Sequence, residues 1–157
     1  MAETRELTLT DKKKLEEELA ELVEAKKRVA EEIKVARGFG DLSENAEYTE
    51  AKAEEARVYG RIADIEMILS GAVFVDDSQV STDAVALGTV VRVLDVEFEE
   101  EEEYTIVGFT EADPLKLFIS QESPIGEALI GKHVGDIVDV KTPGGMIQLK
   151  VLSISKR

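Results

Sequence analysis

Residues 38–48 read Gly38-Phe39-Gly40-Asp41-Leu42-Ser43-Glu44-Asn45-Ala46-Glu47-Tyr48, and they separate two long segments with helical periodicity. Two glycines interrupt the helical pattern here, and carboxylates stand at positions 41, 44 and 47. A short, glycine-containing break between two helical segments indicates a bend at which the chain turns back. The sequence therefore predicts a helical hairpin with an acidic tip.

The segment before the bend, residues 11–37, predicts a helix. It is rich in Lys and Glu, which favour helix, and Thr10 is placed to cap its N-terminus. Its apolar residues recur at spacings of three and four, which is typical of a coiled-coil heptad. They are Leu15, Leu19, Leu22, Val29, Ile33 and Ala36. Lys26 interrupts this apolar seam.

A second helix is predicted from about Leu42 to Leu69, with Glu55 interrupting its seam. The seam residues are Tyr48, Ala51, Val58, Ile62, Ile65 and Leu69. Setting Ala36 opposite Tyr48 also sets Ile33 opposite Ala51, Leu22 opposite Ile62, Leu19 opposite Ile65 and Leu15 opposite Leu69, in a register centred on residue 42. We therefore expect an antiparallel coiled coil, in which Lys26 and Glu55 either pair with each other or both turn to solvent.

From Gly71 onward the pattern changes to that of strands. Strands are predicted at 72–75, 88–94, 104–107, 117–119, 137–140 and 147–151, with a hairpin turn at Thr142-Pro143-Gly144-Gly145. One short helix is predicted from Pro124 to Ile130, with Ser123 as its cap. The fold class is thus α+β, with a hairpin domain at 1–75 and a mostly antiparallel-sheet domain at 76–157. The acidic run 99–103 is expected to be a solvated loop or strand end.

Composition excludes several classes of function. The net charge of −15 disfavours binding to nucleic acid or an anionic membrane. The chain has no Cys and a single His, His133, which argues against disulfides and a zinc site. No apolar run near the N-terminus indicates a signal peptide or membrane span. We expect a soluble cytoplasmic protein.

The acidic residues of the tip have two interpretations. Carboxylates without His or Cys suit a hard cation such as Mg²⁺, and Asp41 and Glu44 are half of such a site, to be completed by a partner. A second ion could then lie beside the partner's own and activate water. Alternatively, Asp41 is the N-cap of the second helix and Glu44 completes a capping box. Glu47 lies one turn further and is mainly expected to be an exposed helix residue.

Two long motifs carry a resemblance to a known family. Residues 36–48 resemble the tip signature of the bacterial transcript cleavage factors, the Gre family. The stretch 123–132, with Val134-Gly135-Asp136 and Thr142-Pro143-Gly144-Gly145, is similar to the C-terminal part of the same family. The resemblance covers essentially the whole chain. One departure is the stretch 113–118, which lacks a Gly-Lys that often stands there.

The resemblance implies a coiled-coil hairpin that enters the secondary channel of bacterial RNA polymerase, and an FKBP-like domain that docks on the channel rim. It implies that Asp41 and Glu44 hold a Mg²⁺ ion jointly with the polymerase, with Glu47 a weaker candidate. The polymerase then hydrolyses the 3′ end of a backtracked nascent RNA, so the factor is not itself an enzyme. Arg37 and Lys52 are implied to contact the RNA or channel. The docking surface expected by resemblance is formed by Ser123, Pro124, Ile125, Gly126 and Leu129.

Two other functions stay open at this point. A paralogue of the same shape would occupy the channel and inhibit, although the intact Asp41 and Glu44 argue against it. An FKBP-like isomerase or chaperone with a coiled-coil arm is the other alternative. The C-terminal half carries few aromatic residues with which to line an isomerase pocket. No membrane partner, resident cofactor or small-molecule substrate is expected.

Overall fold

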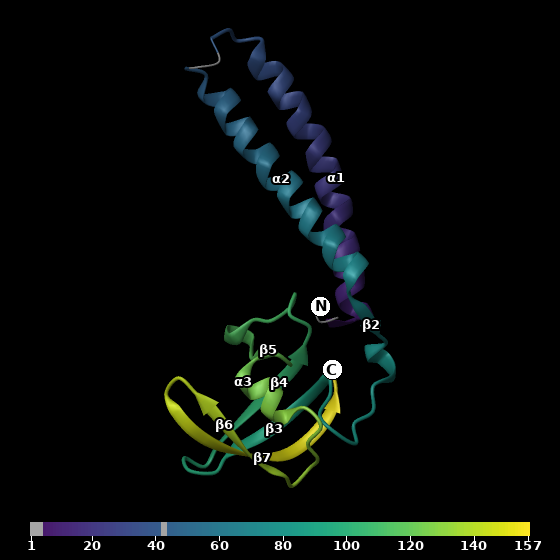
Figure 1. The fold of residues 1–157 in the computed structure, drawn as a ribbon, viewed down its shortest axis with the longest axis vertical. Helices are drawn as coiled ribbons and strands as arrows, with labels where there is room; N and C mark the ends of the chain where they lie inside the picture. The colour runs from purple at the N-terminus through teal and green to yellow at the C-terminus, as the bar shows by residue number, and fades with distance from the viewer. Residues whose placement is uncertain (1–4, 42–43) are drawn as a thin grey trace. The chain divides into compact units, whose positions relative to one another are not determined.

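The computed structural model describes residues 5–41 and 44–157 (Figure 1). The chain divides into two compact units. One unit is the helical hairpin of residues 13–72, and the other combines residues 5–12 with residues 73–157. The predicted boundary at residue 75 assigned the N-terminal residues to the hairpin domain. In the structure, residues 5–12 belong to the sheet-containing unit.

Two antiparallel helices form the hairpin, α1 at Leu9–Arg37 and α2 at Ala46–Gly71 (Figure 1). A cluster of buried side chains from both helices holds them together, and it consists of Val29, Ile33, Ala51 and Val58, with Leu22, Ala25, Tyr48 and Ile62 packed against it. The expected pairs Ile33 with Ala51 and Leu22 with Ile62 all belong to this cluster. Heptad periodicity thus predicted the hairpin and its apolar seam correctly.

The two polar residues in the seam adopt an arrangement that the sequence did not suggest. The Lys26 ammonium lies 4.8 Å from the centroid of the Tyr59 ring on the other helix, as a cation–π contact. The Glu55 carboxylate accepts a hydrogen bond from Lys52 Nζ at 2.7 Å, one turn away on its own helix. Each polar residue therefore finds its own partner: the expected mutual pair does not form, and of the two side chains Lys26 is exposed while Glu55 is half-buried.

The N-terminus of α1 is capped by Thr8 and not by the predicted Thr10. Thr8 N donates to Asp11 Oδ2 at 3.0 Å, and Asp11 N donates to Thr8 Oγ1 at 3.0 Å, which is the reciprocal pattern of a capping box. Thr10 instead donates from Oγ1 to Asp77 Oδ2 at 2.6 Å. The helix consequently starts two residues earlier than the sequence predicted.

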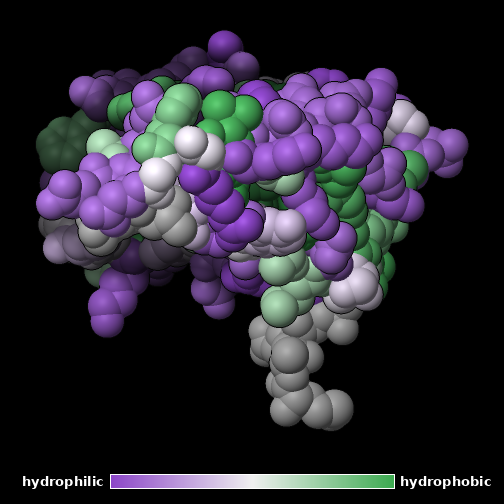
Figure 2. All heavy atoms as spheres, turned by 90° about the horizontal axis from the view of Figure 1, so that it is seen from above, coloured by the Kyte–Doolittle hydropathy of each residue, from purple (hydrophilic) through white to green (hydrophobic). Residues whose placement is uncertain are grey.

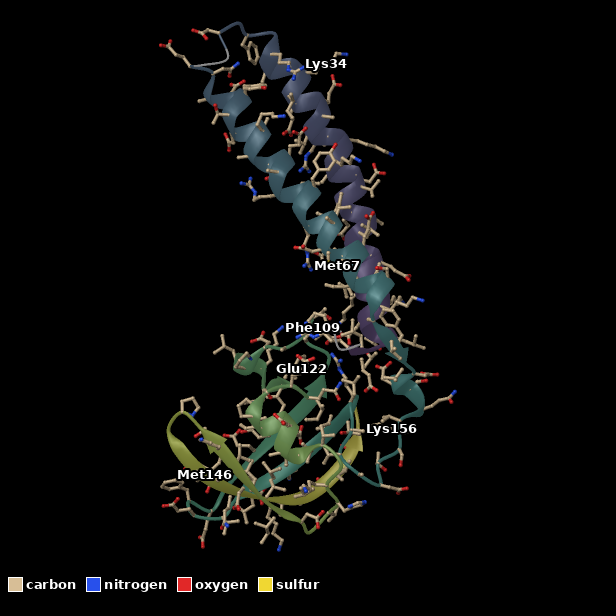
Figure 3. All side chains as sticks on the ribbon, viewed as in Figure 1. Lys34, Met67, Phe109, Glu122, Met146 and Lys156 are labelled. Atoms are coloured by element: carbon tan, nitrogen blue, oxygen red, sulfur yellow. The ribbon has the colours of Figure 1, made fainter. Side chains whose placement is uncertain are left out.

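Two short parallel strands lie at the two ends of the helical hairpin. β1, Glu6–Thr8, directly precedes α1, and β2, Val73–Val75, follows α2; Leu7 is opposite Phe74. Arg5, just before β1, places its guanidinium 4.0 Å from the ring centroid of Phe109 and donates to the carboxylate of Glu122. Phe109 and Glu122 are labelled in Figure 3. These contacts attach the N-terminal segment to the sheet-containing unit. β1 was not predicted from the sequence.

The globular part is built on a five-stranded sheet in the order β5-β4-β3-β7-β6. The strands are β3 at Thr89–Asp95, β4 at Glu100–Val107, β5 at Phe118–Ser120, β6 at Ile137–Thr142 and β7 at Gly145–Lys156. All neighbouring pairs are antiparallel except β4 with β5. Short 3₁₀ helices at Asp77–Gln79 and Pro114–Lys116 lie in the connections. The predicted mostly antiparallel sheet is confirmed.

One helix, α3 at Pro124–Leu129, packs against this sheet, as expected. The core comprises Val85, Leu87, Val91, Val93, Ile106, Leu129, Val138, Val140, Leu149 and Val151. The acidic run 99–103 lies at the start of β4, where its residues are exposed, so its expected solvation is confirmed. Figure 2 shows hydrophilic side chains over most of the visible face, in keeping with a chain in which 34% of residues are charged.

Asp11 and Glu111 form a carboxyl pair that makes the stability of the sheet-containing unit dependent on pH. Asp11 is 1% exposed, and burial together with a hydrogen bond to Glu111 raises its pKa to about 6. Arg157 donates to Glu111 Oε2 at 2.6 Å. Between the ordinary pKa of 3.8 and about 6, the folded state therefore binds more protons than the unfolded state. The contribution of this pair to the free energy of unfolding is consequently lost as pH rises through that window.

We expect Asp11→Asn to raise the melting temperature at neutral pH and to flatten its pH dependence. The amide mimics a protonated carboxyl: its oxygen still accepts from Thr8 N, and its nitrogen can donate to Glu111. Thermal melting of the variant and the parent protein across about pH 4 to 7 measures the effect. An equally steep decline in both proteins would contradict the assignment of this pair.

Candidate functional site

At the tip of the hairpin, the end of α1 is followed by single hydrogen-bonded turns. Gly38 N donates to Val35 O at 3.0 Å, Phe39 N donates to Ala36 O at 3.1 Å, and Gly40 N approaches Arg37 O at 3.4 Å. Gly40 has a φ of 103°, a conformation that favours glycine, and it ends the helical path. The sequence pattern of two glycines thus marked the end of the helix correctly.

Asn45 begins the second helix as its N-cap. Its Oδ1 accepts a hydrogen bond from Tyr48 N at 3.0 Å, and its Nδ2 donates to the carbonyl oxygen of Ala36 at 2.7 Å. One side chain therefore caps α2 and binds the last turn of α1. The capping-box interpretation, with Asp41 as the N-cap and Glu44 completing it, is wrong, and so is a helix start near residue 42.

Asp41 and Glu44 both lie in the segment between the helices, and both are exposed. Leu42 and Ser43, between them, lie outside the described residues. Because Asn45 caps α2, neither carboxylate is needed for that role. Glu47 is exposed in the first turn of α2, where a negative charge is favourable at the helix N-terminus. Asp41 and Glu44 are thus exposed carboxylates that do not form the N-cap of α2.

The chemistry of these carboxylates fits a hard divalent cation such as Mg²⁺. Mg²⁺ commonly keeps several waters and takes only one or two carboxylates from a protein. Within residues 5–41 and 44–157, no three or more His, Cys, Asp or Glu side chains are grouped so that they could hold a metal ion. The described part of the tip therefore offers oxygen ligands without a closed site.

The two expected RNA or channel contacts lie on the same part of the hairpin. Arg37 ends α1, and Lys52 lies in the second turn of α2. The hydrogen bond to Glu55 raises the pKa of Lys52, and the positive charge of Arg37 acts weakly in the opposite direction. Both side chains are exposed and carry positive charge at neutral pH.

The expected docking segment contains residues of two kinds. Ser123 caps α3, accepting from Gly126 N at 3.1 Å and donating from Oγ to Ser120 O at 2.7 Å. Gly126 and Leu129 are buried, and Ile125 packs against the core. Of the five residues expected to dock, only Pro124 is exposed; Glu127, in the same helix, is exposed as well. The buried residues therefore support the surface from below, while the Pro124 side chain is exposed and can contact a partner.

Asn45 is the residue at the tip that the sequence-based interpretation missed. Both Asp41 and Asn45 are good N-caps, and glycines so close to Asp41 favoured the earlier position. The available signal was the run Ala46-Glu47-Tyr48, which resumes the helical pattern immediately after Asn45. None of the described helices combines the length and apolar character needed to cross a membrane.

Comparison with known proteins identifies the family. Residues 6–73 match the model described as transcription elongation factor, N-terminal, and residues 80–156 match that described as transcription elongation factor, GreA/GreB, C-term. Proteins named transcription elongation factor GreA from Clostridium perfringens (strain SM101) and Thermoanaerobacter pseudethanolicus are 52% and 54% identical over 151 residues. In both cases the match covers 96% of this chain and 96% of the relative.

Among solved structures, the GreA factor homolog 1 protein of Thermus thermophilus is 29% identical, with a TM-score of 0.46. That match covers 97% of this chain and 99% of the other. The two family models together span nearly the full length, one on the hairpin side and one on the sheet side. The chain belongs to the GreA/GreB family of transcription elongation factors.

Proposed function

We propose that this elongation factor stimulates RNA polymerase to cleave the 3′ end of a backtracked transcript, by delivering Asp41 and Glu44 to the polymerase active site. The observation that supports the proposal best is the position of these two carboxylates. They are exposed between the ends of the helices, and the capping role that competed for them belongs to Asn45. Both are exposed carboxylates beside the N-cap of α2, which is where the proposal needs ligands for a metal ion that a partner brings.

The length of the hairpin supports this role. The 29 residues of α1 span about 43 Å at 1.5 Å per residue. An arm of this length carries the carboxylates through the secondary channel while the sheet-containing unit stays at the rim. Arg37 and Lys52, near the same tip, supply positive charge toward the RNA phosphates or the channel wall.

Bound Mg²⁺ supplies charge stabilisation and an activated water at the reacting phosphodiester. The contribution of this chain is limited to oxygen ligands and their placement. Asp41 and Glu44 hold the ion jointly with the polymerase, which supplies the remaining ligands and the RNA-binding site. The factor is thus an activator of the polymerase and not a nuclease.

The direct test adds the protein to a stalled, backtracked elongation complex in the presence of Mg²⁺. Shortening of the transcript from its 3′ end, followed by resumed elongation, is the expected result. An inhibitory factor of the same shape would instead slow elongation without cleavage. A prolyl-isomerase assay on the same preparation tests the remaining alternative, and high isomerase activity without transcript cleavage would favour it.

The isolated protein should bind Mg²⁺ only weakly. Two exposed carboxylates leave the ion mostly hydrated, because Mg²⁺ releases its waters reluctantly. Titration calorimetry of the free protein should therefore show no saturable site at the tip in the low micromolar range. A tight stoichiometric site would mean that the factor carries its own metal and that sharing with the polymerase is wrong.

Pro124→Glu should weaken binding to the polymerase and leave the fold intact. Pro124 is exposed at the first position of α3, where Glu is also favourable to the helix. Ile125 is a poor choice for this test, because it packs against the core. Ser155→Glu adds the same charge to an exposed position of β7 and serves as the control. Equal competition by both variants for the polymerase would remove Pro124 from the docking surface.

A further inference from the structure

We infer that Asn45 is the positioning residue for Asp41 and Glu44, an inference that rests on the proposed function. Its carboxamide ties the end of α1 to the start of α2 and so fixes both ends of the segment that carries the two carboxylates. The inference comes from the two hydrogen bonds of one side chain, which join residues nine positions apart as well as capping a helix.

The first step is that both polar atoms of the carboxamide are used. Oδ1 accepts from Tyr48 N at 3.0 Å, and Nδ2 donates to Ala36 O at 2.7 Å. Ala36 O also accepts from Phe39 N at 3.1 Å, so the last turn of α1 and the cap of α2 meet at one carbonyl group. Ala36 itself is 2% exposed, so this carbonyl belongs to a buried residue of the hairpin.

The second step concerns the choice of residue. Ser, Thr and Asp cap a helix by offering an acceptor, and an N-cap needs nothing more. Asn is the preferred cap whose side chain carries an acceptor oxygen and an NH₂ donor on two separate atoms, so it can cap a helix and donate to another segment at once. The bond to Ala36 O therefore uses the property that distinguishes Asn from the other caps.

The third step is the effect on the carboxylates. Asp41 and Glu44 are exposed, so core packing does not fix their positions. Glu44 is bonded directly to Asn45, and Asp41 follows the turn that ends at Gly40. Closing the segment at Ala36 and Asn45 restricts the positions available to both carboxylates before any partner binds. Without this tie, the conformational cost of bringing Asp41 and Glu44 to one ion falls on the step in which the metal ion is held.

The test uses Asn45→Ser in the full-length protein. Ser keeps a cap acceptor for Tyr48 N, but its side chain is too short to reach Ala36 O. By amide hydrogen exchange of the free protein, Phe39 and Gly40 should exchange faster, while Tyr48 should keep its protection. Val58→Ala is the matched control, because it weakens the buried seam far from the tip. It should lower the melting temperature without changing the exchange of Phe39 relative to its neighbours.

The second readout is the Mg²⁺ dependence of cleavage at saturating factor, with Asp41→Asn assayed in parallel. Asn45→Ser should need more Mg²⁺ for half-maximal cleavage and, at a fixed limiting Mg²⁺, should cleave roughly 10–100-fold more slowly, as when groups that orient metal ligands are removed. Val58→Ala should match the wild type once it is saturating. A purely structural role of Asn45 would lower the melting temperature and leave the Mg²⁺ requirement unchanged.

Two outcomes overturn the inference, and they are distinct. If Asp41→Asn is inactive but Asn45→Ser has the wild-type Mg²⁺ requirement and unchanged exchange at Phe39, Asn45 only caps the helix and the proposed function stands. If Asp41→Asn cleaves as the wild type does, the proposed function fails, and the positioning role fails with it.

Discussion

Asp41→Asn is expected to remove stimulated RNA cleavage while leaving the hairpin as stable as before. Asn is neutral and a much poorer ligand for Mg²⁺ than a carboxylate. The loss should be about 100-fold or more, the scale seen when one group that stabilises charge in a transition state is removed. Stability should not change, because Asp41 is exposed and the N-cap of α2 is Asn45. The measurements are transcript cleavage in a backtracked complex and thermal melting.

Two variants serve as comparisons for this result. Glu44→Gln should behave like Asp41→Asn, and both should still compete with the wild type for the polymerase, since docking is expected elsewhere. Asn45→Ala should differ from both in stability, because it destabilises the hairpin by about 1 kcal/mol, the typical effect of losing an N-cap. Full cleavage by Asp41→Asn would remove the central element of the proposed function.

Gly126→Ala is expected to destabilise the sheet-containing unit strongly, although it lies in a helix. Alanine normally stabilises a helix relative to glycine by up to about 1 kcal/mol. Here a Cβ would clash with the carbonyl oxygen of Ser120 and lie 2.9 Å from its carbonyl carbon and 3.0 Å from Gln121 Cα. All of these atoms belong to the backbone and cannot move aside as a flexible side chain does. We expect a net loss of about 3 kcal/mol, at the upper end for overpacking.

The loss should appear as a decrease in melting temperature of roughly 10 °C or more for a unit of this size. Gly144→Ala is the matched control: a Cβ there has its nearest neighbour, Thr142 Oγ1, at 3.8 Å. A folded Gly126→Ala protein with an unchanged melting temperature would contradict the close packing of α3. It also follows that weaker polymerase binding by Gly126 variants would report damage to the fold and not a lost contact.

The parts of the fold that repeat along the chain were predictable from the sequence. The heptad of Leu, Val and Ile set the seam of the hairpin, because many positions agree on one register. The Pro-Gly-Gly turn and the alternation around it predicted the pairing of β6 with β7. Each of these features rests on several residues acting together, so one polar residue in the seam, such as Lys26, did not obscure it.

Features that depend on a single residue were harder to predict. Several good N-caps stand near each helix start, and tertiary contacts decide among them: Thr8 caps α1 because Asp11 returns the bond, while Thr10 binds Asp77. Asn45 caps α2 because its amide also reaches Ala36. β1 has three residues, too few to establish a period of two, and it exists because β2 pairs with it across 64 residues of intervening chain.

The pairing of β1 with β2 has a consequence for how the chain is assembled. Parallel neighbours need a long crossover connection, and here the crossover is the entire helical hairpin. The arm is thus an insertion whose entry and exit are held about 5 Å apart, the spacing of adjacent strands. Removing seven residues from each helix would preserve the seam and shorten the arm by about 10 Å. The hairpin therefore sets a distance by its length. This length can change, by evolution or by design, without altering the sheet.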